Sequence, residues 1–224
     1  MMGPSLRLLV AGVTAMSCLA VAGCSDPAAD LGSGSTAETI EALRACAETR
    51  DPEVVKRVAQ VVSHQDTMVA AEAVRSLGRM RHEKAVAVIQ DIAAGTLDRR
   101  SAVRQEAVIQ LGRQRQASEE VLGTLREVVT VDPDPRVRAA AATSIAQQRS
   151  LMDVALLIDV AEQETDPVVQ ARAVGAVEKM VGLRFGYDPT ASKDEREAAL
   201  QRLRRLGTTA AAAAKRFQEH KRGR

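Results

Sequence analysis

A pattern of three apolar residues recurs along the chain at a nearly constant interval, and this repetition restricts the fold more than any other feature. Within each copy the apolar residues are four positions apart, as in Val69, Ala73 and Leu77. Successive copies begin 34, 34 and 32 positions apart, at Val69, Val103, Val137 and Val169. Residues four apart lie on one face of an α-helix, so each copy predicts a helix with one apolar stripe. A fixed period of this length is typical of a helical solenoid.

Helix-starting residues precede several of these stripes. Aspartate accepts a backbone hydrogen bond at the N-cap, and proline at the first helical position has no N–H to leave unpaired. The pairs are Asp51-Pro52, Asp134-Pro135 and Asp166-Pro167. Glycine suits a helix end, so Gly78 and Gly112, each directly after a stripe, are expected to end their helices.

A second set of apolar-periodic segments alternates with the first. Three of them lie at residues 85–92, 121–128 and 154–161. Each unit is therefore predicted to be a hairpin of two antiparallel helices. With no Trp, one Tyr and two Phe, the core must consist of Val, Leu, Ile and Ala, which suits closely packed helices and not a β-sandwich or barrel.

The segments TVDPDPRVRAAAATSIA, SAVRQEAVIQLG and ETDPVVQARAVGAVEKM resemble HEAT repeats, particularly the short HEAT-like repeats named after phycobilisome lyases. The resemblance covers about residues 37–182 and implies an all-α fold, a right-handed α-solenoid of antiparallel helical hairpins. It also implies a ladder between units, made by an Asp before the second helix and an Arg six positions later. The matching pairs are Asp98/Arg104 and Asp132/Arg138, while Glu164/Gln170 keeps half of the pattern and His64/Ala70 departs from it.

The N-terminal segment has the features of a secretory signal peptide over residues 1–23. Arg7 precedes an apolar run too short for a comfortable membrane span. The residues before Cys24 resemble a bacterial lipobox, which implies lipidation of Cys24; the alternative is an ordinary signal with a chance cysteine. Ser25 then favours the outer membrane. Residues 24–36 read as a flexible tether, and Cys46 is expected to be a small buried residue and not a reactive thiol.

The C-terminal part differs from the repeats. Residues 183–206 are expected to form a capping loop and helix, in which Ser192 and Glu195 make a capping box. Phe185 and Tyr187 in that loop either plug the end of the core or stack on a ligand. Residues 207–224 form a basic, alanine-rich tail. This tail either attracts an anionic envelope polymer or is a solvated helix end.

Nothing in the sequence indicates catalysis, a metal site or a cofactor. His64, His82 and His220 are far apart and lack other ligands at metal-binding spacing. The segment at residues 32–34 has no third glycine, and no GxSxG motif occurs. We therefore expect a protein that is not an enzyme and that has no catalytic residues, metal or cofactor.

A contact surface is predicted on the side of the stripe helices that faces away from the core. Three and ten positions after the start of each stripe, residues should point outward. Resemblance to HEAT arrays places these helices on the concave side. The outward rows are Glu72, Glu106, Ala140 and Arg172, and Arg79, Arg113, Gln147 and Lys179. The cations Arg79, Arg113 and Lys179 are the candidate contacts for an acidic partner, the alternative being a merely soluble face.

Three functions are compatible with these features. The first is an envelope-anchored lipoprotein that binds an unidentified protein partner through the concave face and the bilayer through acylated Cys24. The second is a polyanion-binding envelope protein that acts through the basic tail, with nucleic acid an unlikely partner because aromatic interleaving is absent. The third is a lyase-type HEAT-repeat enzyme, which the apolar stripes disfavour.

Overall fold

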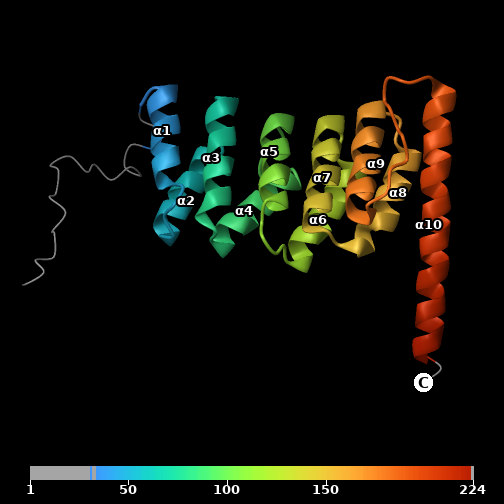
Figure 1. The fold of residues 1–224 in the computed structure, drawn as a ribbon. Helices are drawn as coiled ribbons and strands as arrows, with labels where there is room; N and C mark the ends of the chain where they lie inside the picture. The colour runs from blue at the N-terminus through green and yellow to red at the C-terminus, as the bar shows by residue number, and fades with distance from the viewer. Residues whose placement is uncertain (1–30, 32–33, 223–224) are drawn as a thin grey trace, which may run out of the picture.

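The computed structural model describes residue 31 and residues 34–222, with side chains described up to Gly207. Within these residues every regular secondary-structure element is a helix, which confirms the predicted all-α class (Figure 1). The elements are α1 (Thr36–Cys46), α2 (Pro52–Val61), α3 (Thr67–Met80), α4 (Glu83–Ala93), α5 (Ser101–Gly112), α6 (Glu119–Val131), α7 (Pro135–Gln148), the short 3₁₀ helix η1 (Leu151–Asp153), α8 (Val154–Gln163), α9 (Pro167–Val181) and α10 (Lys193–Arg222).

The helices form an α-solenoid of two layers. Helices α1, α3, α5, α7 and α9 stand side by side in one layer, here called the odd layer (Figure 1). Helices α2, α4, α6 and α8 form the even layer behind it. Each even-layer helix pairs with the odd-layer helix that follows it, and neighbouring hairpins stack against one another. Each period of the sequence pattern thus corresponds to one helical hairpin.

The predicted helix starts are confirmed at the Asp-Pro pairs. Asp51, Asp134 and Asp166 are N-caps whose side chains accept hydrogen bonds from backbone N–H groups two residues further on. A proline occupies the first helical position after each of them. These caps satisfy N–H groups that have no partner inside the helix, so α2, α7 and α9 each begin at a defined residue.

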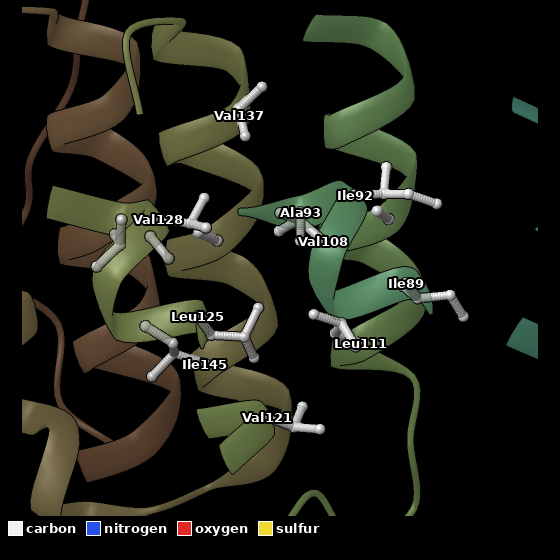
Figure 2. Close-up of a cluster of buried hydrophobic side chains, with 14 of the residues drawn as sticks. Ile89, Ile92, Ala93, Val108, Leu111, Val121, Leu125, Val128, Val137 and Ile145 are labelled. Carbon is white, nitrogen blue, oxygen red and sulfur yellow. The ribbon is translucent and has the colours of Figure 1, made fainter. Parts of the chain in front are cut away.

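The apolar stripes form one continuous core. Val137, Ala141 and Ile145 of α7 are fully buried, as are the equivalent residues of α3, α5 and α9. Figure 2 shows side chains from both layers meeting between the hairpins, including Ile92 of α4, Leu125 of α6 and Leu111 of α5. Because each stripe is covered by residues of adjoining hairpins, no hairpin buries its apolar face alone.

Cys46 is buried at the end of α1, as expected. Its thiol contributes to the same core as Leu43 and Val58.

The expectation that Gly78 ends its helix is wrong, since α3 continues for two residues beyond it. Gly112 is the last residue of α5. Both glycines lie where odd-layer helices approach one another closely. A Cβ atom on Gly78 would lie 2.9 Å from Cδ of Gln110, and one on Gly112 would lie 2.6 Å from Cβ of Ser144. At position 78 the side chain of Gln110 occupies the space that a Cβ atom would take, whereas at position 112 the nearby atoms include the Ser144 backbone.

The loop after α9 closes the end of the core. Phe185 is buried and Tyr187 packs partly buried against the core. Nε of Arg202 donates a hydrogen bond to the Phe185 carbonyl oxygen at 2.9 Å, which ties the loop to α10. These contacts agree with the core-plug interpretation and leave the Phe185 ring inside the protein.

Helix α10 is longer than the sequence predicted. The capping box is present, with the Ser192 backbone N–H donating to Glu195 Oε2 at 3.0 Å. Instead of ending near Leu206, the helix continues to Arg222 and extends past the solenoid (Figure 1). The alanine run in its second half accounts for this continuation, because alanine has the highest helix propensity. No described helix is both long and apolar enough to span a bilayer.

Two glycines should respond to alanine in opposite directions. Gly112→Ala is expected to lower the free energy of unfolding by about 1–3 kcal/mol, because its Cβ overlaps Ser144 on the neighbouring helix. Gly123→Ala in α6 should raise it by about 0.5–1 kcal/mol, because nothing lies within 4 Å of the added atom. Urea unfolding followed by far-UV circular dichroism measures both. A Gly112→Ala protein as stable as the parent would contradict the close packing.

Candidate functional site

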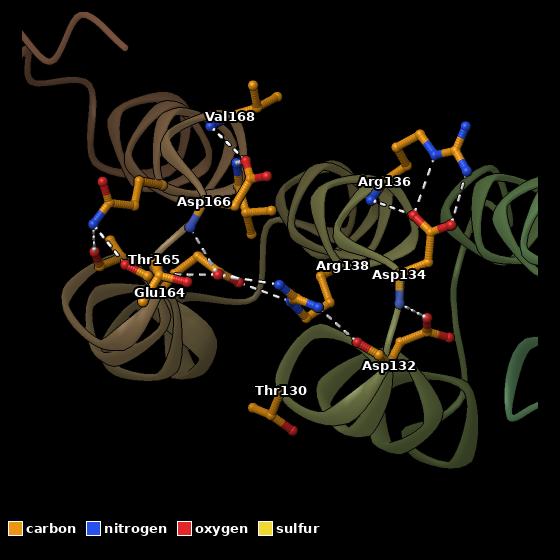
Figure 3. A network of polar contacts seen from close by, with 12 residues as sticks. Thr130, Asp132, Asp134, Arg136, Arg138, Glu164, Thr165, Asp166 and Val168 are labelled. Carbon is orange, nitrogen blue, oxygen red and sulfur yellow. Dashed lines mark hydrogen bonds and ion pairs between the residues drawn. The ribbon is translucent and has the colours of Figure 1, made fainter.

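The arginine–carboxylate pairs of the ladder join neighbouring hairpins. Nε and Nη2 of Arg104 donate to the two carboxylate oxygens of Asp132 at 2.8 and 2.9 Å. In the next rung, Arg138 donates to both oxygens of Glu164 at 2.7 and 3.1 Å, and to the Asp132 carbonyl oxygen at 2.8 Å (Figure 3). Each arginine therefore joins the start of its own odd-layer helix to the start of the next.

The charges of this ladder are well stabilised. Burial raises the pKa of Glu164, but hydrogen bonds from Arg138 and from the backbone N–H groups of Asp166 and Thr165 outweigh it, so the pKa lies below its ordinary value. A carboxylate with a lowered pKa contributes stability that is present above about pH 4.3 and is lost as the pH falls through the folded-state pKa. The ladder is therefore intact at neutral pH.

The N-terminal end of the ladder is built differently. The residue that would reach Asp98 from the preceding hairpin is Ala70, which has no polar side chain. Arg100 replaces it: Nη2 donates to Asp98 at 2.5 Å, and the guanidinium also donates to the carbonyl oxygens of His64 at 2.7 Å and Val62 at 2.8 Å. This rung runs backwards, from the later hairpin to the earlier one.

At the other end, Gln170 takes the place of the ladder arginine. Its Nε2 donates to the Glu164 carbonyl oxygen at 2.8 Å. Its Oε1 accepts a hydrogen bond of 2.5 Å from the Tyr187 hydroxyl. The closing loop therefore ends the ladder as well as the core.

A second polar chain crosses the first three odd-layer helices. Glu72 accepts hydrogen bonds from Arg44 at 3.1 Å and from Arg75, and Arg75 also donates to Glu106 at 3.0 Å. Gln110 donates to the other Glu106 oxygen at 2.7 Å. The expectation that Glu72 points outward from the layer is wrong, because its side chain is buried between neighbouring helices. In the sequence, these ion pairs could have been suspected from opposite charges that recur about one repeat apart, as Arg44 and Glu72 do at a separation of 28 positions.

The other predicted row is exposed. Arg79, Arg113 and Lys179 lie near the C-terminal ends of α3, α5 and α9, and Gln147 has the equivalent place in α7. Within the described residues, none of the three cationic side chains forms an ion pair or hydrogen bond. The row therefore presents unneutralised positive charge on one face of the odd layer.

The same face carries a groove along α7, with a volume of about 390 Å³. It is open to solvent and lies between α5 and α9, and we call it the α7 groove. Its lining residues are Gln105, Ile109, Arg136, Ala139, Ala140, Thr143, Ser144, Gln147, Val168 and Arg172. Small residues of α7 make the floor, because the alanine run of that helix continues on its outer side.

The described residues offer no cluster of three or more His, Cys, Asp or Glu side chains that could hold a metal ion. His64 accepts a hydrogen bond from the Asp66 backbone N–H at 3.0 Å, and His82 accepts one from the Lys84 N–H at 3.1 Å. His64 thus stabilises the loop before α3, and His82 is the N-cap of α4. Cys24, the predicted lipidation residue, lies outside the described residues.

Comparison with known proteins identifies the repeat. A family model described as HEAT repeats matches residues 29–103 and 95–178, which together are more than half of the chain. The chain is a HEAT-repeat protein. The crystal structure of an engineered protein is similar at 19% identity and a TM-score of 0.45, over 79% of this chain and 93% of that one. No curated protein sequence is significantly similar.

In this HEAT-repeat protein, a buried arginine–carboxylate pair of the ladder should contribute far more to the stability of the fold than an exposed ion pair does. Arg104→Met is expected to destabilise the fold by about 3–5 kcal/mol, because it leaves the buried Asp132 carboxylate without its partner. Arg136→Met should leave the unfolding midpoint close to that of the parent, because exposed ion pairs are screened by solvent and 73% of the Arg136 side chain is exposed against 8% for Arg104. Urea unfolding midpoints provide the comparison, and equal losses in the two variants would refute the structural role of the rung.

Proposed function

We propose that this protein is a non-catalytic scaffold, held at a bacterial membrane by a lipid on Cys24, which binds a protein partner on the outer face of the odd layer. HEAT repeats form helical scaffolds that present extended surfaces for such binding. The observation that carries the proposal is the coincidence, on one face, of three unpaired cations with the α7 groove.

The packing of the two layers supports this choice of face. Neighbouring helices pack more closely within the odd layer than within the even layer. In a curved two-layer array, the inner layer has the shorter spacing between helices, so the odd layer fits the concave side. A concave face surrounds a partner, whereas the even layer presents separate convex ridges.

Membrane attachment is supported by the sequence alone. The lipobox-like residues before Cys24 and the tether of residues 24–36 would place the solenoid close to a bilayer, exported from the cytoplasm, and Ser25 favours the outer membrane. Two or more acyl chains hold a protein stably at a membrane, whereas one chain holds it only marginally. In this arrangement the scaffold presents its partner at the membrane surface.

The anchor is tested by Cys24→Ala. The parent chain should incorporate labelled fatty acid in a bacterial host and sediment with the membranes, while the variant should lose both properties because it lacks the acylated sulfur. Metabolic labelling and membrane fractionation give the two readouts. An unlabelled, soluble parent protein would overturn the lipoprotein part of the proposal and leave the scaffold part standing.

The binding face is tested by a photoreactive amino acid placed at Arg79 or Arg113 in cells that express the protein naturally. Discrete crosslinked adducts are expected from these odd-layer positions. The matched controls are Glu127 and Asp159, exposed residues of α6 and α8 in the even layer. Adducts of equal yield from both layers, or from the even layer alone, would contradict the proposed face.

A second candidate function is polyanion binding by the end of α10. The observation in its favour is that α10 extends past the solenoid (Figure 1). After Leu200 the sequence has eight lysines and arginines and the single acidic residue Glu219. Such a segment attracts anionic envelope polymers by long-range electrostatics.

A further inference from the structure

We propose that the α7 groove binds a short acidic peptide segment of a partner protein, which inserts apolar side chains between flanking carboxylates. This inference rests on the scaffold function proposed above and names the chemistry that one part of its face recognises. Three independent observations support it: the shape of the groove, its charge, and a glycine on the adjoining helix.

The shape follows from the alanine run of α7. The side chains of Ala139, Ala140 and Thr143 are short, so α7 forms a low floor between α5 and α9. Ile109 of α5 and Val168 of α9 provide apolar walls, and Val168 is 55% exposed. The lining is more apolar than polar, and the volume of about 390 Å³ has room for a few side chains of a peptide. Burial of apolar side chains in such a groove is favourable.

The charge of the groove selects acidic segments. Its lining includes two arginines and no carboxylate. Arg172 is exposed and makes no ion pair among the described residues, while Arg136 forms an ion pair with Asp134. Toward the opposite ends of the helices lie the unpaired cations Arg113 and Lys179. A segment with carboxylates on both sides of an apolar centre therefore finds positive charge at both ends, whereas a basic segment is repelled.

Gly175 of α9 leaves the helix backbone uncovered beside the groove. It lies six residues after Val169, as Thr143 lies six residues after Val137, so it belongs to the same outer face. Within 4 Å of a Cβ atom built on Gly175 there is nothing, so packing inside the protein does not require glycine. A glycine inside a helix is less favourable than an alanine, because its backbone loses more conformational freedom. The bare backbone leaves space for a peptide backbone beside the groove.

The experiment uses selection from a phage-displayed library of random dodecapeptides on the purified exported part of the chain, residues 25–224. Single-residue variants are compared with the parent protein. Thr143→Trp fills the groove from an exposed position, and Arg172→Glu reverses its charge. Thr130→Trp places the same side chain on an exposed position of α6 and is the matched control for Thr143→Trp. Far-UV circular dichroism establishes that every variant is folded.

The expected result is enrichment of acidic peptides with a central apolar pair on the parent protein. A fluorescein-labelled copy of the most enriched peptide should bind about tenfold more weakly to Thr143→Trp and to Arg172→Glu, and unchanged to Thr130→Trp, in fluorescence anisotropy. Binding should weaken as salt is raised. A Gly175→Leu variant should also lose affinity, while Gly123→Leu should not.

Three outcomes would overturn the inference. They are no enrichment, enrichment of basic or neutral peptides, and binding that survives Thr143→Trp. If crosslinks from Arg79 and Arg113 still appear under any of these outcomes, the scaffold function stands and only the assignment of the α7 groove fails. If the crosslinks are absent but acidic peptides bind the groove, the proposed cellular role fails while the groove chemistry holds.

Discussion

The fold depends on one constraint: each hairpin carries an apolar stripe that only the adjoining hairpins can cover. A helix of about a dozen residues is marginal in isolation, and the stripe residues of α7 are fully buried only because α5, α6 and α9 pack around them. Stability is therefore shared along the array and does not reside in any single unit. The closing loop and α10 are needed for the same reason, since the last hairpin has no following hairpin to cover it.

Stacking by apolar contact alone would leave neighbouring hairpins free to slide, and the arginine rungs remove that freedom. A bidentate guanidinium–carboxylate pair has a fixed geometry, so Arg104 with Asp132 and Arg138 with Glu164 define how one odd-layer helix starts relative to the next. The close contact at Gly112 acts at the opposite end of the same helices. Between these two contacts, the outer face of the odd layer keeps a defined shape.

Periodicity and capping residues were sufficient to predict the class of fold, the hairpin unit and the helix starts at the Asp-Pro pairs. They report which face of a helix is apolar, and the Asp-Pro pairs report where a helix begins. They could not predict the partners of Glu72, Gly78 or Arg100, because each contacts a residue about one repeat away. Which residues meet across that distance depends on the rotation and spacing of packed helices, and these are properties of the assembled array. The exposed row of Arg79, Arg113 and Lys179 could be anticipated, whereas the groove beside it required the positions of three helices.

The reversed rung has a consequence for how the number of repeats can change. If the hairpin of α4 and α5 were deleted in register, Ala70 would stand opposite Asp132, and both Arg100 and Arg104 would be lost with the deleted segment. The residue of α7's hairpin that corresponds to Arg100 is Asp134, an acid, so the buried Asp132 carboxylate would lose its bidentate partner and gain no replacement. The units of this solenoid are alike in shape yet not interchangeable, and the array resists loss of this repeat by simple recombination.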